Sequence, residues 1–190
     1  MVPVVIRALA LLVLCASAAR ASVDLTPTDT VQLMETMKVH RIVFHDGAKQ
    51  ILYQAPKGWS CNGSSSSAVL SIPQHPAARA SINDAAHLRI PALDDKSAKQ
   101  FYKDPTLLQL PKDSKDVKVN SVVLNPLVVD GHPTLEVQVT YSYYGQSCAR
   151  SILLIDRNGE EISCVLDCLA PDFDALHKLF AGSFYSFENL

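Results

Sequence analysis

The chain has 190 residues, of which 48% are hydrophobic and 19% charged, and its formal net charge at pH 7 is −2. This length is enough for one domain with a substantial apolar core. The charged residues form no polybasic cluster, which excludes the electrostatic surface that nucleic-acid-binding proteins use. We therefore expect a single domain without a nucleic-acid partner.

The first 21 residues have the anatomy of an export signal. Arg7 precedes a short apolar run, and small residues lead to a signal-peptidase site between Ala21 and Ser22. The apolar run is shorter than the roughly 20 residues that a bilayer-spanning helix needs. Loss of Arg7 and Arg20 with this signal changes the net charge from −2 to near −4. We expect an exported protein, periplasmic or extracellular, with no transmembrane segment in the mature chain; the alternative is a lipoprotein anchored through Cys15.

The N-terminal half of the mature chain is predicted to be mainly strands. Residues 22–40 are interpreted as an N-terminal arm or a short helix, and residues 41–190 as a single α+β domain. Residues 41–55 are typical of a hairpin, because Asp46-Gly47 is a favoured tight turn between two apolar runs. The serine run 64–67 predicts a loop, and further strands follow at 68–72 and 77–83.

The second half combines strands with two helices. Asp94 or Asp95 can cap a helix that ends near Lys103. Residues 117–129 are strand-like, and Pro126 places them at a sheet edge or at a bulge. Residues 134–144 alternate strictly between apolar and polar, which predicts a strand with one buried face. Two strands around an Asn-Gly turn and an amphipathic helix from Pro171 complete the chain. The pattern predicts a mostly antiparallel sheet flanked by helices, an α/β/α sandwich with a C-terminal amphipathic helix.

Four cysteines remain after the export signal, and in an exported protein they predict two disulfides. On a strand, Cys164 and Cys168 lie roughly 13 Å apart, too far for a disulfide, which needs Cα atoms within about 7 Å. A three-residue loop around Asn158-Gly159 would pair Asp156 with Glu160. This register places Cys148 opposite Cys168, and Cys61 then pairs with Cys164 by elimination. A slip of one residue would undo the first assignment.

The sequence contains no recognisable catalytic motif. A nucleophile elbow is missing, the histidines lack the spacing of zinc ligands, and the two nearest cysteines lie in a strand rather than at a helix N-terminus. We expect no catalytic residue, no bound metal and no cofactor. Trp59 is the single tryptophan, and we expect it to anchor the core, with a surface binding role as the alternative.

Two segments resemble the PsbP superfamily, named after the extrinsic subunit of the photosynthetic oxygen-evolving complex. They are YQAPKGW (residues 53–59) and the closing block from Ser151 to Phe187. A yeast nuclear import factor that binds the small GTPase Ran is similar in fold. The resemblance implies an antiparallel sheet flanked by helices and a binding or assembly role without catalysis. Metal-site residues of plant members have no matching motif here, and the four cysteines depart from the family pattern.

These observations favour an exported, non-enzymatic domain that binds a protein or an envelope component. One alternative is a small hydrolase or thiol-redox enzyme with an unrecognised site. Another is a carrier of apolar ligands, which would use the apolar face of the sheet. The carrier hypothesis predicts a deep apolar cavity under the helices.

Overall fold

The computed structural model describes residues 23–34, 37–85, 93–157 and 161–189. The predicted export signal, its cleavage position between Ala21 and Ser22, and Cys15 lie outside these residues, as does the Asn158-Gly159 turn. Within the described part of the chain, no helix is both long enough and apolar enough to cross a bilayer.

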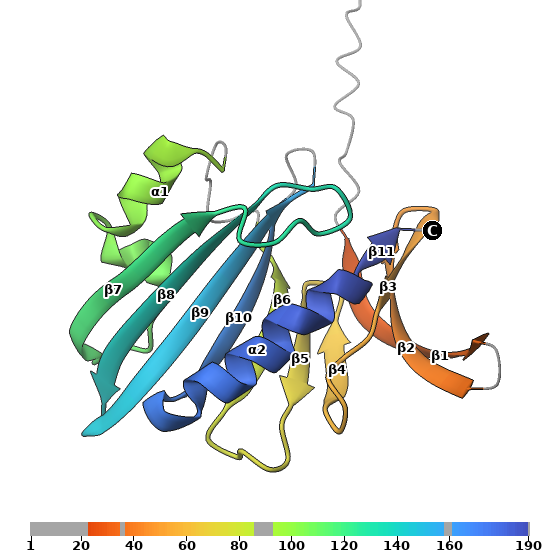
Figure 1. The fold of residues 1–190 in the computed structure, drawn as a ribbon, viewed down its shortest axis with the longest axis horizontal. Coiled ribbons are helices and arrows are strands. Elements are labelled where there is room, and N and C mark those ends of the chain that lie inside the picture. The colour runs from red at the N-terminus through yellow and green to blue at the C-terminus, as the bar shows by residue number, and fades with distance from the viewer. Residues whose placement is uncertain (1–22, 35–36, 86–92, 158–160, 190) are drawn as a thin grey trace, which may run out of the picture.

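The described residues form two antiparallel sheets (Figure 1). In spatial order, the larger sheet contains β4 (Ser60–Ser64), β5 (Ser67–Ser71), β6 (Arg79–Asp84), β10 (Glu161–Leu169), β9 (Gln146–Asp156), β8 (Thr134–Tyr143) and β7 (Lys115–Leu124). The smaller sheet contains β1 (Asp24–Met34), β2 (Met37–Asp46), β3 (Lys49–Tyr53) and β11 (Glu188–Asn189). The predicted mostly antiparallel architecture of the α+β class is therefore confirmed.

Two α-helices lie on opposite sides of the larger sheet. They are α1 (Asp95–Phe101) and α2 (Phe173–Ser183), and short 3-10 turns accompany them at η2 (Pro105–Leu108), η3 (Ala170–Asp172) and η4 (Phe184–Ser186). The Asp94 side chain caps α1 by accepting a hydrogen bond of 2.8 Å from the Ser97 amide, as predicted from the sequence. The closing helix α2 buries Leu176 and Phe180, which confirms its amphipathic pattern.

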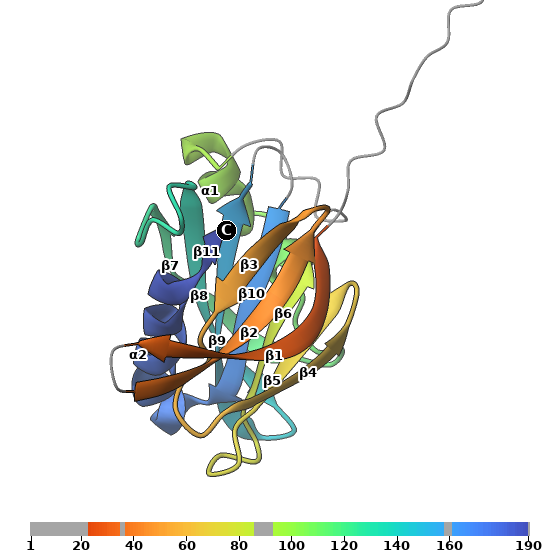
Figure 2. The same cartoon turned by 90° about the vertical axis from the view of Figure 1, so that its right-hand side faces the viewer.

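The larger sheet separates two apolar cores. On one face, Phe101 and Leu108 from α1 and η2 pack on Leu135, Val137 and other apolar residues of β8 and β9. The opposite face is covered jointly by α2 and the smaller sheet, which lie side by side in Figures 1 and 2. The predicted α/β/α sandwich is thus only partly right, because half of one outer layer is a second sheet.

The N-terminal segment is a strand, so the expected arm or short helix is wrong. β1 pairs with β2 through most of its length, and its Leu25 amide donates a 2.9 Å hydrogen bond to the Ser65 carbonyl beside β4. This contact joins the two sheets where β1 meets β4. The β2–β3 hairpin is as predicted: Asp46 pairs with Lys49, and Gly47 takes a left-handed conformation (φ 59°) in the turn.

β7 is the outer strand of the larger sheet, as Pro126 led us to expect. It pairs only with β8, and its register shifts twice, between Lys115 and Lys118 and between Val119 and Ser121. Such bulges bend an edge strand and interrupt its hydrogen-bonding row.

The predicted cysteine pairing rests on a register that the structure contradicts. Asp156 pairs with Glu161 rather than with Glu160, so Cys168 lies opposite Ala149. Neighbouring residues on a strand point to opposite faces. The one-residue difference therefore places the side chains of Cys148 and Cys168 on different faces of the sheet, and the bridge predicted between them is wrong.

The error has a physical cause in β9. This central strand is buried on both faces: Ile152 and Leu154 face one core, whereas Leu153 and Ile155 face the other. Either register of β10 would therefore bring apolar side chains together. Side-chain parity selects a register only when one face of the strand is polar.

The second predicted bridge is also unsupported. Cys61 lies on β4 and Cys164 on β10, with β5 and β6 between them. Three strand spacings amount to roughly 14 Å, about twice the separation that a disulfide allows. Cys61, Cys148, Cys164 and Cys168 are all free thiols in the structure.

Candidate functional site

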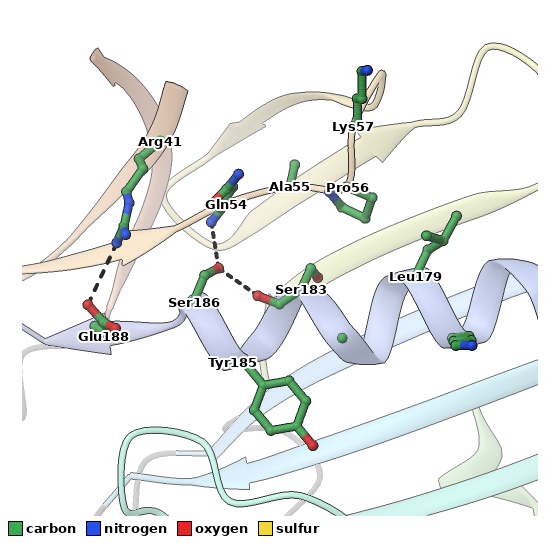
Figure 3. Close-up of a pocket in the computed structure, with 12 residues that line it drawn as sticks. Arg41, Gln54, Ala55, Pro56, Lys57, Leu179, Ser183, Tyr185, Ser186 and Glu188 are labelled. Carbon is green, nitrogen blue, oxygen red and sulfur yellow. Dashed lines mark hydrogen bonds and ion pairs between the residues drawn. The ribbon is translucent and has the colours of Figure 1, made fainter. Parts of the chain in front are cut away.

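A groove of about 600 Å³ runs between α2 and the segment that links β3 to β4 (Figure 3). One wall is the loop Gln54–Lys57, which continues from β3, and the other is the C-terminal half of α2 with η4. The first wall is the central part of the sequence YQAPKGW, which carried the family resemblance. The groove is open to solvent along its length.

Hydrogen bonds hold the two walls together at the base of the groove. The buried Tyr53 hydroxyl lies 2.9 Å from Ser183 Oγ, which itself donates to the Phe180 carbonyl. The Gln54 amide donates a 2.8 Å hydrogen bond to Ser186 Oγ. Burial is the main reason that the pKa of Tyr53 is raised, so its hydroxyl stays protonated and remains a donor to Ser183. Ser183 is therefore a packing and bridging residue.

Basic side chains dominate the charge of the groove. Arg41, Lys57 and Lys178 line it, against a single carboxylate, Glu188. Arg41 and Glu188 form an ion pair at 3.6 Å. Lys57 and Lys178 are exposed and form no ion pair with any described residue. The groove thus offers two uncompensated positive charges, one on each wall.

Large apolar side chains on α2 and η4 border these charges. Leu179 is 53% exposed and Tyr185 is 70% exposed, although both belong to well-packed elements. Figure 3 shows Leu179 projecting toward the loop wall and Tyr185 projecting from the other side of the helix. Single exposed apolar residues are common on protein surfaces, and here two of them border the same charged groove.

Trp59 positions the loop wall. Its indole stacks on the ring of Phe180, which is buried in α2, and it packs against the core formed by α2 and the smaller sheet. Trp59 does not line the groove. Its contacts are those of the expected core anchor, and it acts on the groove only through the position of the Pro56–Trp59 turn.

A buried polar cluster fixes α2 on the sheet. Glu136 of β8 accepts hydrogen bonds from Ser151 at 2.7 Å and from His177 of α2. Burial alone would raise the pKa of Glu136, but the hydrogen bonds from His177 and Ser151 outweigh it, so the pKa of this carboxyl is lowered overall. Glu136 is only 8% exposed, and the cluster therefore serves as a specific anchor for the helix.

A second polar network lies on the opposite face of the sheet. The Arg150 guanidinium donates to the carbonyls of Leu108 and Gln109 and to the carboxylate of Asp167. Tyr141 donates a 2.6 Å hydrogen bond to the same carboxylate. These bonds tie η2 to β8, β9 and β10, which is a structural role.

The cysteines have the wrong electrostatics for thiol-redox chemistry. Burial raises the pKa of Cys61 to about 11 and that of Cys168 to about 12, and it raises the pKa values of Cys148 and Cys164 as well. A redox cysteine needs a lowered pKa, because the thiolate is the nucleophile. Among the described residues, no three His, Cys, Asp or Glu side chains gather as metal ligands would.

Sequence reasoning missed the groove residues. Arg41, Lys57 and Lys178 come from three distant segments, and each reads as an ordinary solvated lysine or arginine along the chain. The signals that could have pointed to the region are the YQAPKGW segment, which was noted only for the family resemblance, and Leu179, an apolar residue on the polar side of the closing helix that was not singled out. Only the packing of α2 beside the β3–β4 loop brings these features together.

Comparison with known proteins finds similar solved structures at low sequence identity. No family model and no curated protein matches the sequence. Similar solved structures include cyanobacterial PsbP (CyanoP) from Synechocystis, with a TM-score of 0.49, 13% identity, and coverage of 92% of this chain and 96% of that chain. The Saccharomyces cerevisiae Ran-binding protein Mog1p gives a TM-score of 0.43 at 8% identity, with coverage of 84% and 90%.

A third similar structure is LpqN, a protein involved in cell envelope biogenesis of Mycobacterium tuberculosis. It gives a TM-score of 0.41 at 15% identity and covers 86% of this chain and 90% of that chain. PsbP and the Ran-binding protein are the two proteins that the sequence resemblance named. Because all three similarities are remote, we infer function from the side chains of this chain alone.

Proposed function

We propose that this chain is an exported, non-enzymatic domain that binds a protein partner in the groove between α2 and the Gln54–Lys57 loop. The observation that carries the proposal is the combination of two exposed, unpaired lysines with Leu179 and Tyr185 on rigid elements. Apolar groups held on packed elements lower the conformational cost of recognition, and the exposed lysines add charge at the same place. Export is supported by the signal anatomy of residues 1–21.

The alternatives receive less support from the described residues. A carrier of apolar ligands needs an enclosed apolar cavity, whereas this groove is open and bordered by charges. A thiol-redox enzyme needs a thiolate, and burial disfavours the thiolate of every described cysteine. We therefore propose binding rather than transport or redox catalysis.

The test of binding is affinity capture from the exported fraction, with the chain from Ser22 onward as bait. The groove variant carries Leu179→Ser and Tyr185→Ser. The matched control carries Val69→Ser and Tyr102→Ser, because Val69 is 46% and Tyr102 58% exposed and both lie outside the groove. Each captured protein is then purified and its affinity measured by calorimetry.

We expect a partner that binds the wild-type protein and the control equally and binds the groove variant at least tenfold more weakly. Far-UV circular dichroism and the urea midpoint establish that all three proteins are folded. If the groove variant retains every partner of the wild type, the groove is not the binding surface.

Export is tested separately by the mass of the protein recovered from outside the cytoplasm. We expect a chain that begins at Ser22. A mass that includes residues 1–21, or a lipid-modified Cys15, would contradict the proposed processing.

A further inference from the structure

We infer that the segment bound in the groove is acidic and extended, and that it carries at least one large apolar side chain. This inference rests on the proposed function and narrows it to one chemical class of partner: a protein segment rich in aspartate and glutamate.

The charge of the groove is opposite in sign to that of the protein. Three basic side chains and one acidic side chain line it, an excess of two positive charges, whereas the whole chain has a net charge of −2. The rest of the surface is net negative and repels acidic segments, whereas the positive groove attracts them at one place. Electrostatic complementarity of this kind gives both a faster association and a preferred orientation.

The placement of the lysines favours an extended segment over a small anion. Lys57 stands on the loop wall and Lys178 on the helix wall, and both are exposed. A phosphate or sulfate ion would instead require several donors converging on one enclosed point. Adjacent side chains of an extended peptide point to opposite sides, so neighbouring acidic residues would reach Lys57 and Lys178 respectively.

The apolar part of the groove requires a large apolar side chain on the bound segment. Leu179 faces the loop wall, where Ala55 and Pro56 offer further apolar surface (Figure 3). Burial of a large apolar side chain there would remove both Leu179 and its partner from water, at about 25 cal/mol for each Å² of apolar surface. Charge alone would give weak binding, since exposed ion pairs contribute little.

The proposal is tested by selection from a random peptide library displayed on phage, with the immobilised chain from Ser22 onward as the target. The charge-reversed variant carries Lys57→Glu and Lys178→Glu. The matched control carries Lys112→Glu and Lys99→Glu: Lys112 is an exposed turn lysine like Lys57, and Lys99 is an exposed helix lysine like Lys178. Both double variants change the net charge equally, and circular dichroism verifies that both are folded.

We expect selected peptides to be enriched in Asp and Glu together with Leu, Phe, Tyr or Trp. The synthetic peptides should bind the charge-reversed variant at least about tenfold more weakly than the control, and salt should weaken their binding to the wild type. The selected peptides could instead be neutral or basic and still bind the Leu179→Ser, Tyr185→Ser variant more weakly than the wild type. That result would overturn the inference that the partner is acidic, but the groove would remain a binding site.

Two further outcomes would also overturn the inference. The first is no enrichment, or peptides that bind all variants equally. The second is binding to phosphatidylglycerol vesicles, but not to phosphatidylcholine vesicles, that is lost in the charge-reversed variant while no acidic peptide is selected. That result would assign the lysines to an anionic lipid surface.

Discussion

The indole of Trp59 and the phenyl ring of Phe180 stack with their centroids 6.2 Å apart and their planes inclined by 18°. Phe180 also contacts Phe184 edge to face, with centroids 5.0 Å apart, and Phe184 in turn stacks on Tyr53 at 5.6 Å. The aromatic series therefore runs from the loop wall of the groove, through α2, to the smaller sheet. Aromatic contacts of this type stabilise beyond the area they bury.

Replacing Trp59 with alanine should lower the free energy of unfolding by about 2–3 kcal/mol. The reason is the loss of the stacked ring and the cavity left against Phe180. The measurement is urea denaturation followed by circular dichroism. Tyr144→Ala is the control, because Tyr144 is 83% exposed and should change stability little. If Trp59→Ala leaves the free energy of unfolding unchanged, other contacts hold the loop wall in place.

Gly63 is required for the close packing of the β4–β5 hairpin. A Cβ atom at this position would lie 2.3 Å from the Ser67 carbonyl oxygen and 2.8 Å from the Ala68 Cα, and both of these are backbone atoms. Gly63→Ala should therefore destabilise the protein by about 1–3 kcal/mol. The matched substitution Gly182→Ala meets no atom within 4 Å and lies in α2, so it should stabilise by up to about 1 kcal/mol. Thermal unfolding of both variants tests the contrast in sign.

Glu136 should make stability depend on pH in the acid range. A carboxyl whose pKa is lower in the folded than in the unfolded protein stabilises the fold above its unfolded pKa, about 4.3 for Glu. That stabilisation is lost as the pH falls through the pKa that the carboxyl has in the folded protein. The pKa of Glu136 is lowered by the hydrogen bonds from His177 and Ser151, which prevail over the effect of burial.

The test compares unfolding free energies of the wild type and Glu136→Gln from neutral pH to pH 3. We expect a difference of about 1–3 kcal/mol at neutral pH, because Glu136→Gln loses hydrogen bonds to a charged acceptor. This difference should become smaller below the pKa of Glu in the unfolded protein. Asp174→Asn removes an exposed carboxyl from α2 and should give a smaller difference at every pH. A difference for Glu136→Gln that does not vary with pH would show that its carboxyl is not ionised in the fold.

All four cysteines should titrate as thiols once the protein is unfolded. Cys164 is fully buried and burial raises its pKa well above the ordinary value, so it should not react in the native protein. DTNB added to the unreduced chain from Ser22 onward should give four equivalents in guanidinium chloride and far fewer without it. Two or no equivalents in denaturant would mean that cysteines are oxidised in pairs, and a Cys148–Cys168 bridge among them would mean that the β9–β10 register differs from the one described.

The sequence predicted helices and strands well where the residue pattern fits only one type of secondary structure. The alternation of residues 134–143 identified β8 as a strand, and Asp94 marked the start of α1. The expectation that only one face of β8 is buried is wrong, because Thr134 and Glu136 on its polar face are buried as well. The antiparallel direction of the strands followed from tight turns, whereas their order in the two sheets was not predicted. The overall antiparallel class was therefore accessible without the structure.

The predictions that proved wrong concern contacts between segments that are far apart in the sequence. β9 is apolar on both faces, so the side chains of β10 could not indicate the register between the two strands. The predicted cysteine pairing depended on that register and was therefore wrong. β1 begins with polar residues because part of it is exposed at the edge of the smaller sheet, and its pairing with β2 was not visible in its composition. The groove could not be predicted, since α2 and the β3–β4 loop are separated by more than a hundred residues.

The bulged outer strand β7 has a consequence for solubility. An unpaired strand edge can recruit the same edge of another molecule and start aggregation. Lys115 and Lys118 carry positive charge along this edge, and the two register shifts twist its amides and carbonyls out of line. Two molecules that approach through β7 therefore meet lysine charges of the same sign and misaligned backbone donors and acceptors, which should disfavour edge-to-edge pairing through this strand.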